Sequence, residues 1–417
     1  MNDDHVAVRC GPVSLTESQL CDVVRRVGTE RRFVSGRLVP IVERDRIQSL
    51  IFALAARASG AIPLLGDDRW DAQFWAGLRV LADDAAVAPD TAWAAFSSGS
   101  SGTPRVILRS EHSWSASFPA VTELMELTAF DSVYLPAPLS SSMSLFSVAH
   151  SRSVGAGIVL PSGHNVCSAD LEHATALHST PQALRAVVES IEGGATRHRL
   201  RTALLGGAQL DASLRERAET LGIRVVSYYG AAELSFVAVD IDGRGHRPFP
   251  GAELRIDAGE LWVRSPYAAS GYLGAAGALR RDAQGWATVG DLVDGDPLGP
   301  LRFRGRKDGA ILTAAATVVP EDVEAALRTI DGIEDAVVFG LPNAGVGYLV
   351  GALLETTTGR ALPSVRELRE QAGTRLAPSH LPRRWFWTKR LPRTAAGKPA
   401  RARIQHDVVN GKVTRLE

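Results

Sequence analysis

Residues 202–230 read TALLGGAQLDASLRERAETLGIRVVSYYG. The stretch opens with a short apolar run, TALLG, which predicts a β-strand. An amphipathic pattern follows, with Asp211 placed as an N-cap and Gly222 placed where a helix ends. A second apolar run, IRVVSYYG, predicts another strand. Strand, helix and strand in this order predict a βαβ crossover with two parallel strands.

The two predicted strands bring small and aromatic residues to one place. Because the carboxyl ends of parallel strands meet at the same edge of a sheet, we expect Gly206-Gly207 and Tyr229-Gly230 to lie together there. Short apolar runs alternate with helical patterns along most of the chain, and this texture predicts an α/β fold. We expect a large N-terminal domain of α/β subdomains.

The pattern changes in the second half of the chain. From 251 to 305, short strands such as ELWVRS and LRFRG are separated by Gly, Pro and Asp turns, which predicts a β-rich subdomain. Beyond it, a helix starting at Pro320 and further strands predict a small α+β C-terminal domain. The predicted domains are therefore 1–305 and 306–417.

The composition is that of an ordinary folded protein. Of 417 residues, 45% are hydrophobic and 22% are charged, which argues against long disordered, collagen-like or coiled-coil segments. Lys+Arg and Asp+Glu are equal at 46 each, so no global charge attracts nucleic acid or an anionic membrane. We expect small neutral or locally steered ligands.

Cysteine usage and the N-terminal sequence predict a cytoplasmic location. Cys10, Cys21 and Cys167 are too few and too scattered for a disulfide framework or a thiolate metal site, which fits a reducing cytosol. The first ten residues, MNDDHVAVRC, are acidic and lack the apolar run of a signal peptide. The apolar stretch 50–65 is interrupted by Arg57, which predicts a buried helix and strand rather than a membrane span.

The most informative loop follows the apolar run TAWAAF. Its glycines allow tight turns whose N–H groups can point inward, and its hydroxyls and arginine add donors and a cation, so it suits a polyphosphate. It is not a Walker loop, because no Gly-Lys-Ser/Thr ends it. A flexible Ser/Gly linker is the alternative interpretation. The loop reads Ser97-Ser98-Gly99-Ser100-Ser101-Gly102-Thr103-Pro104-Arg105.

With this loop in place, the chain resembles the AMP-forming acyl-activating family, which comprises acyl-CoA synthetases, adenylation domains and luciferases. The family's phosphate loop reads T-S-G-[ST]-T-G-x-P-K, and the resemblance runs from about residue 50 to residue 403. Further matches follow in family order: GGA at 206–208, YGAAE at 229–233, GELWVRSPYAASGYLG from 259, TVGDL at 288–292, FRGRKDG from 303 and LPRTAAGK from 391.

The resemblance implies a nucleotide site. Tyr229 would offer a flat face to adenine, while the main chain of 206–208 would approach the edge of the base. Asp291 would accept hydrogen bonds from the ribose hydroxyls, and Arg306 would reach the same region. With the phosphate loop, the implied nucleotide-binding residues are Ser97, Ser98, Gly99, Ser100, Ser101, Gly102, Thr103, Gly206, Gly207, Ala208, Tyr229, Gly230, Asp291 and Arg306.

The implied catalytic residues are Lys398, Glu233 and Arg105. Lys398 would bridge the substrate carboxylate and the α-phosphate as two anions meet. Glu233 would hold Mg2+ against the phosphates, because a hard cation prefers carboxylate oxygen. Taken singly, each residue would more readily be interpreted as a solvated or packing residue, and the ordered set of motifs reverses that preference. His164, His173 and His178 lack the spacing of metal ligands on one helical face and are interpreted as surface or packing residues.

The chain departs from the family pattern at several positions. Arg105 replaces the usual lysine of the phosphate loop, which keeps the charge but changes a point donor into a planar fork. Ala232 stands where a threonine usually touches the phosphate, so one hydroxyl is missing. Leu312 and Ala315 replace a frequent lysine and glycine, which puts the usual pantetheine tunnel in doubt. Asp308 aligns with the hinge about which the family's C-terminal domain moves.

The expected function is that of an AMP-forming acid–thiol ligase using ATP, Mg2+ and CoA. A carboxylic acid would be adenylated and then joined to the thiol, and no nucleic acid or membrane span is expected. The predicted acyl pocket holds Ser140, Ser141 and Ser142 and no acid, which disfavours an α-amino acid and leaves an aryl or short to medium acyl acid. o-Succinylbenzoate is attractive only because its ligases tend to be similarly short.

The sequence also allows two alternatives to a CoA-dependent ligase. The thiol acceptor could be the phosphopantetheine arm of an acyl carrier protein rather than CoA. The chain could also be a catalytically weakened nucleotide-binding homologue, as the replacements at 232, 312 and 315 suggest.

Overall fold

The computed structural model describes most of the chain. At 72–74, 305–306, 312, 317 and 347 it describes the main chain alone. The described residues are 5–67, 72–83, 87–96, 105–163, 166–194, 197–274, 278–306, 309, 311–312, 317–343, 347–357, 359–376, 380–394 and 397–416.

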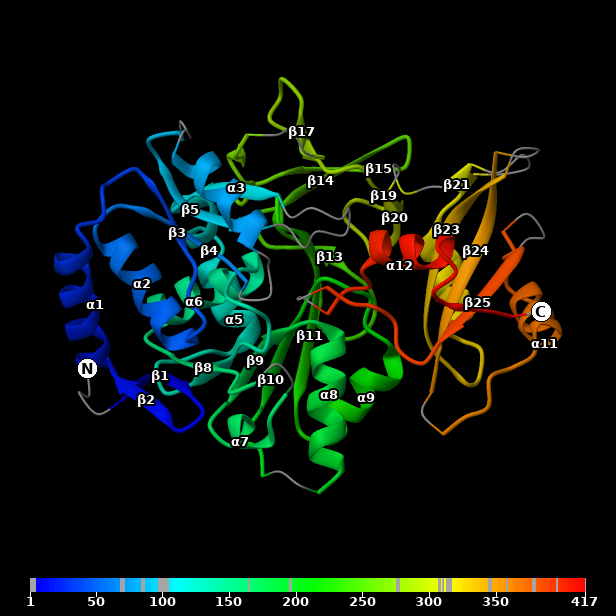
Figure 1. The fold of residues 1–417 in the computed structure, drawn as a ribbon, viewed down its shortest axis with the longest axis horizontal. Helices are drawn as coiled ribbons and strands as arrows, with labels where there is room; N and C mark the ends of the chain where they lie inside the picture. Colours follow the sequence, from blue (N-terminus) through cyan, green and yellow to red (C-terminus); the bar gives the residue numbers. More distant parts are fainter. Residues whose placement is uncertain are drawn as a thin grey trace.

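A nine-stranded sheet forms the centre of the N-terminal domain (Figure 1). Its order is β13-β12-β11-β10-β9-β7-β8-β1-β2; neighbours from β11 to β1 run parallel, and antiparallel strands close both edges. The strands are β1 (Val6–Cys10), β2 (Val13–Thr16), β7 (Ser132–Tyr134), β8 (Gly157–Leu160), β9 (Ala176–Ser179), β10 (Thr202–Leu205), β11 (Arg224–Ala231), β12 (Ser235–Asp240) and β13 (Arg247–Pro248).

Helices cover both faces of this sheet, and a separate core fills each side. One core lies beneath α1, α2, α5 and α6, and the other lies beneath α7, α8 and α9. The bounds are α1 (Glu17–Arg31), α2 (Arg46–Ala58), α4 (His112–Ser115), α5 (Phe118–Met125), α6 (Ser142–Val154), α7 (Ser168–Leu171), α8 (Pro181–Glu192) and α9 (Ala212–Thr220).

The predicted βαβ crossover is confirmed as β10, α9 and β11, and β10 pairs parallel with β11. The predicted N-cap position of Asp211 is also confirmed. Asp211 occupies the N-cap position of α9, but its side chain makes no capping hydrogen bond. Its carboxylate instead accepts a 2.9 Å hydrogen bond from Arg185 on α8, because the stronger charged donor lies within reach.

Two smaller sheets complete the N-terminal half. A five-stranded sheet, in the order β16-β6-β5-β4-β3, is covered by α3 (Ala72–Asp83). The predicted β-rich subdomain is a six-stranded sheet in the order β17-β18-β15-β19-β20, with β14 paired to β15. The strands are β3 (Leu38–Ile41), β4 (Ile62–Leu65), β5 (Thr91–Phe96), β6 (Val106–Ser110), β16 (Gly271–Tyr272), β14 (Glu253–Asp257), β15 (Glu260–Arg264), β17 (Arg280–Arg281), β18 (Ala287–Thr288), β19 (Asp291–Gly295) and β20 (Leu301–Arg306).

The C-terminal domain, yellow to red in Figure 1, is a four-stranded sheet with helices packed against it. A segment preceding α12 extends from this domain toward the N-terminal domain (Figure 1). The elements are β21 (Ile311–Leu312), β22 (Thr317–Val318), α10 (Pro320–Leu327), β23 (Ile333–Asn343), β24 (Gly347–Thr356), α11 (Val365–Gly373), β25 (Arg384–Thr388), α12 (Arg401–Val409) and β26 (Thr414–Leu416).

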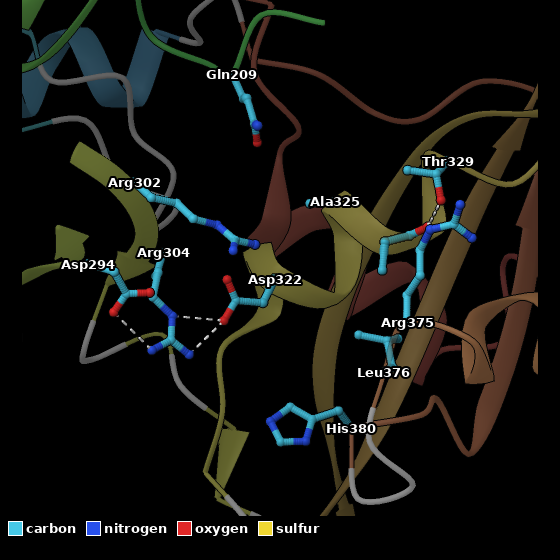
Figure 2. Close-up of a pocket in the computed structure, with 11 residues that line it drawn as sticks. Gln209, Asp294, Arg302, Arg304, Asp322, Ala325, Thr329, Arg375, Leu376 and His380 are labelled. Carbon is cyan, nitrogen blue, oxygen red and sulfur yellow. Dashed lines mark hydrogen bonds and ion pairs between the residues drawn. The ribbon is translucent and has the colours of Figure 1, made fainter. Parts of the chain in front are cut away.

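Ion pairs join the two domains. Arg304 on β20 donates through Nε and Nη2 to Asp322 on α10, at 3.1 and 2.9 Å, and also lies near Asp294 (Figure 2). Arg185 on α8 lies 3.2 Å from Glu334 on β23. Together these pairs hold the C-terminal domain against β20 and α8 of the N-terminal domain.

Within the described part of the chain, every helix is too short or too polar to cross a membrane.

Candidate active site

The site is built at the carboxyl ends of β10 and β11. Gly206 follows β10, and its N–H donates to the carbonyl of Ser179 at 3.0 Å. A Cβ on Gly206 would lie 2.2 Å from Cζ of Tyr228, so the tyrosine ring occupies the space that a side chain would need. Gly207 has φ +85°, and a Cβ there would lie 3.0 Å from Cε of Lys398. Both glycines therefore make room for side chains from elsewhere in the fold.

Lys398 is delivered by a turn of the C-terminal domain. The Thr394 N–H donates to the Lys398 carbonyl at 2.7 Å, and the Gly397 N–H donates to the Thr394 carbonyl at 2.9 Å. Gly397 has φ +77°, and a Cβ there would lie 3.4 Å from Oγ1 of Thr180, the N-cap of α8. The turn thus sits against the N-terminal end of α8, with its lysine beside Gly207.

Half-buried charges hold this turn to the C-terminal sheet. Arg393 donates to the Gly397 carbonyl at 3.3 Å and to the carboxylates of Asp335 and Glu355 at 2.8 and 3.3 Å. Burial raises the pKa of Asp335, but the charges and hydrogen bonds of Arg328 and Arg393 outweigh it and hold that pKa below its ordinary value. The turn carrying Lys398 is therefore anchored by an ionised network.

Tyr229 is tied to the β-rich subdomain. Its hydroxyl donates to Oδ2 of Asp291 at the start of β19. Its ring stacks on Phe303 of β20, with centroids 3.5 Å apart and planes 16° apart. The pairing of β19 with β20 sets the main chain of Arg306 opposite Asp291. Tyr229, Asp291 and the main chain of Arg306, which were predicted to bind adenine and ribose, therefore lie close together. Phe303 covers one face of the Tyr229 ring.

Glu233 follows the end of β11 by two residues, and it is 6% exposed. Its Oε1 accepts a 2.8 Å hydrogen bond from the hydroxyl of Tyr272. Burial and the charge of Glu233 raise the pKa of Tyr272 to about 12, while Arg105 acts on the same hydroxyl in the opposite direction. Glu233, Tyr272 and Arg105 therefore share one electrostatic neighbourhood.

Arg109 also belongs to this neighbourhood, and sequence reasoning missed it. Its guanidinium is fully buried and donates to the carbonyls of Tyr267 and Ala232 at 2.8 and 2.5 Å. Burial lowers its pKa to about 9, against the opposing charge of Glu233. The signal was present in the run VILRS, because an arginine inside an apolar strand needs buried acceptors.

His178 and Tyr228 were also missed as site residues. The hydroxyl of Tyr228 lies 3.0 Å from Nε2 of His178, and Nδ1 of His178 lies 2.5 Å from Oγ of Ser147 on α6. Burial, with a smaller contribution from His150, lowers the pKa of His178 to about 3, so its imidazole is neutral. The doubled tyrosine at 228–229 was the available signal, because successive strand residues face opposite sides.

The predicted acyl-pocket serines lie at the start of α6. Ser141 is the N-cap, and its Oγ accepts from the Ser144 N–H at 3.1 Å. The carbonyl of Ser140 accepts from Phe96 N–H at 3.3 Å, which ties this segment to β5. Ser142 begins the helix and is partly exposed.

Some predicted positions lie outside the described residues: 97–104 of the phosphate loop, Asp308, Ala315 and His164. The other two histidines named in the sequence analysis lie at surface and packing positions: His173 is exposed and His178 is buried. In the described part of the chain, no group of three or more His, Cys, Asp or Glu side chains could hold a metal ion.

Comparisons with known proteins agree with this architecture. The model of the AMP-binding enzyme family matches residues 10–273, and that of the AMP-binding enzyme C-terminal domain matches residues 322–398. The chain is 26% identical over 336 residues to the uncharacterized acyl–CoA ligase YhfT of Bacillus subtilis, covering 74% of this chain and 67% of that protein. It is 30% identical over 363 residues to triostin synthetase I of Streptomyces triostinicus, covering 79% and 68%.

Among solved structures, the chain is similar to the o-succinylbenzoate CoA synthetase of Bacillus subtilis, solved with its acyl-adenylate intermediate and with ATP and a magnesium ion. The comparison with the acyl-adenylate complex gives a TM-score of 0.81 at 20% identity and covers 97% of this chain and 96% of that one. The predicted α/β fold, with a large N-terminal and a small C-terminal domain, is confirmed by this likeness. The family match extends across both domains, and the chain belongs to the AMP-binding enzyme family.

Proposed function

We propose that this chain is an ATP-dependent, AMP-forming acid–thiol ligase. The observation that carries the proposal is the placement of Lys398, which the C-terminal domain delivers beside Gly207 at the end of β10. Acyl–CoA ligases among the relatives support the same reaction class. We propose 306 as the first residue of the C-terminal domain.

In the first step, a carboxylate oxygen attacks the α-phosphorus of ATP and pyrophosphate leaves, giving an acyl-adenylate. Two anions must approach one another, and the ammonium group of Lys398 lowers that repulsion. Tyr229 and Asp291 would position the adenosine, and Arg105 with the loop at 97–104 would bind the phosphates. The work of these residues is positioning and charge neutralisation.

Glu233 fits a magnesium ion bound together with the phosphates. Its carboxylate supplies the hard oxygen that Mg2+ prefers, and the hydroxyl of Tyr272 orients it through Oε1. When bound there, the ion would neutralise charge on the phosphate oxygens. Arg109 fixes the main chain just before this carboxylate by binding the carbonyl of Ala232.

In the second step, a thiolate attacks the acyl carbon and AMP leaves, giving a thioester. Lys398 must withdraw for the thiol to enter, so the C-terminal domain must turn about the boundary near Asp308. We propose free CoA as the acceptor, an aryl or short to medium acyl acid as the substrate, and the cytoplasm as the location. The three cysteines, all free thiols, support a reducing compartment.

An acid-panel assay tests the proposal. ATP–pyrophosphate exchange should appear with aryl or short acyl acids and not with α-amino acids, and thioester should form when CoA is added. If exchange occurs but thioester forms only with a holo-carrier protein, the phosphopantetheine arm of that protein is the acceptor rather than CoA. Binding of ATP with no exchange across the panel would identify a weakened nucleotide-binding homologue and overturn the proposal.

A further inference from the structure

The aromatic core beneath Gly206 contains one connected chain of polar side chains. Ser147 on α6, His178 on β9 and Tyr228 on β11 are linked by contacts of 2.5 and 3.0 Å. Strand β10 runs between β9 and β11, so these two strands are separated by roughly 10 Å. Tyr228 reaches His178 because Gly206, at the level between them, has no side chain.

The directions of the hydrogen bonds in this chain can be assigned. Ser147 Oγ lies 3.0 Å from the carbonyl of Met143, and a carbonyl can only accept, so the single hydroxyl proton of Ser147 points there. Ser147 must then accept from Nδ1–H of His178. A neutral imidazole has one N–H, so its Nε2 is an acceptor and the hydroxyl of Tyr228 donates to it.

The opposite arrangement is disfavoured by the same contacts. If Ser147 donated to Nδ1, its contact with the Met143 carbonyl would not be a hydrogen bond. The proton of Tyr228 would also lose its acceptor, because its only described polar contact would then be the N–H of His178. Buried polar groups satisfy their hydrogen bonds, so the first arrangement is the stable one.

Tyr228 packs against the Gly206-Gly207 segment that Lys398 also approaches. Its hydroxyl oxygen is 2.6 Å from the position of a Cβ on Gly206, and Lys398 lies beside the next residue, Gly207. Its neighbours His178 and Phe236 are 2% and 3% exposed, whereas Tyr228 keeps accessible surface. The Tyr228 ring packs against Phe236, with centroids 4.6 Å apart.

Since its proton is used by His178, the hydroxyl oxygen of Tyr228 can only accept a further hydrogen bond. We propose that Tyr228 selects carboxylic acids that carry an N–H or O–H donor beside the carboxylate, with Ser147 and His178 fixing its direction. This inference rests on the proposed ligase activity. The surrounding rings favour planar acids, so the substrate class is hydroxyaryl or N–H heteroaryl carboxylic acids.

Matched pairs of acids test this selection. Indole-2-carboxylate and benzofuran-2-carboxylate have nearly the same shape and differ in the N–H, as do pyrrole-2-carboxylate and furan-2-carboxylate. We expect kcat/KM for ATP–pyrophosphate exchange to favour the N–H acid of each pair by about tenfold. Binding of the matching acyl-sulfamoyl-adenosine analogues, measured by calorimetry, should give a preference of the same sign without turnover.

Two variants separate this role from a structural one. Tyr228→Phe should bring the ratio near one, because it removes the oxygen that accepts from the N–H acid. Ser147→Ala removes the group that fixes the tautomer, so the ratio should fall several-fold. Ser151→Ala is the matched control, because the Oγ of Ser151 is buried on the same helix and has no hydrogen-bond partner among the described residues. Its ratio should not change.

The results of these assays would separate a failure of acid selection by Tyr228 from a failure of the proposed ligase activity. An equal or reversed preference in the native chain, with exchange intact, would overturn the selection by Tyr228 and leave the ligase activity standing. An unchanged ratio in Tyr228→Phe would overturn it as well. Exchange with no acid of either kind would overturn the proposed function and this inference together.

Discussion

The buried guanidinium of Arg109 donates a 2.5 Å hydrogen bond to the carbonyl of Ala232, the residue that precedes Glu233. A strand of the five-stranded sheet is thereby joined to the end of β11 at the point where the phosphates are expected. A buried guanidinium without acceptors, or a buried carbonyl without its donor, would destabilise the folded state.

Arg109→Met should destabilise the protein, because the carbonyls of Ala232 and Tyr267 would be left buried without their donor. We expect the free energy of unfolding, measured by urea titration, to fall by about 2–4 kcal/mol. Arg264→Met is the control, since that side chain is exposed and paired with Glu253 at the surface. A loss for Arg109→Met no larger than that of the control would contradict a role for these hydrogen bonds.

Lys398→Ala should lower adenylation by about 10²–10⁴-fold, because its charge is needed while the carboxylate meets the α-phosphate. Thioester formation from a supplied acyl-adenylate should be nearly unchanged. Separate assays of the two half-reactions measure both effects. Lys389→Ala, at an exposed position of the same domain, should leave both rates intact. Equal losses in both half-reactions would show that Lys398 does not withdraw.

Ala232→Thr tests the missing hydroxyl. A threonine there should restore a hydrogen bond to the phosphate region and raise the adenylation rate by about two- to twelvefold, corresponding to roughly 0.5–1.5 kcal/mol. Steady-state kinetics with the preferred acid provide the measurement. A fall in rate would instead indicate that the pocket is built around alanine. No change would mean that the side chain at 232 faces neither phosphate nor acid.

Asp308→Pro should spare adenylation and abolish thioester turnover, because proline fixes φ and prevents the domain from alternating between two orientations. Asp308 lies outside the described residues, so this prediction rests on the family resemblance. Asp308→Ala, which leaves φ free, is the matched control and should retain both steps. Normal thioester turnover in the proline variant would exclude Asp308 as the hinge.

Acid should weaken the fold through its buried histidines. Burial lowers the pKa of His150 to about 4 and that of His178 to about 3, and it also lowers the pKa of His246. The unfolded chain therefore binds more protons below pH 6.5, and stability falls as pH drops. We expect up to about 1.4 kcal/mol per pH unit for each of His150 and His178 between pH 6.5 and 5.

Urea titrations across that pH range measure the slope. His150→Gln should make it shallower, whereas His173→Gln, at an exposed position, should not. A slope that is the same in both variants would show that His150 does not titrate in this way. Carboxylates held below their ordinary pKa, such as Asp131, lose their contribution only at lower pH.

Much of the fold followed from local pattern. The crossover over 202–230 carries its own strand, helix and strand signals, and the helix predicted to start at Pro320 is observed as α10. Asp211 was placed correctly at the N-cap of α9, and its carboxylate pairs with Arg185 instead of capping the helix. Local sequence specifies a helix end, but the arginine that competes for the carboxylate comes from another helix.

The inner part of the site could not be predicted in this way. His178 and Tyr228 are separated by 50 residues in sequence and meet only because the sheet order places β9, β10 and β11 side by side. Arg109 likewise finds its acceptors 158 and 123 residues away. Contacts across strands depend on sheet order, which periodicity along one chain does not specify.

The anchoring of the Lys398 turn has a consequence for the energetics of each cycle. Arg393 links the Gly397 carbonyl to the ionised network of the C-terminal sheet, so the main chain that carries Lys398 forms a rigid part of that domain. The ordering entropy of that turn is incurred when the C-terminal domain folds and is not repeated at every turnover. In the proposed rotation of the C-terminal domain, the ammonium group would move with that domain as one unit, so its distance from the phosphates would follow the angle between the two domains.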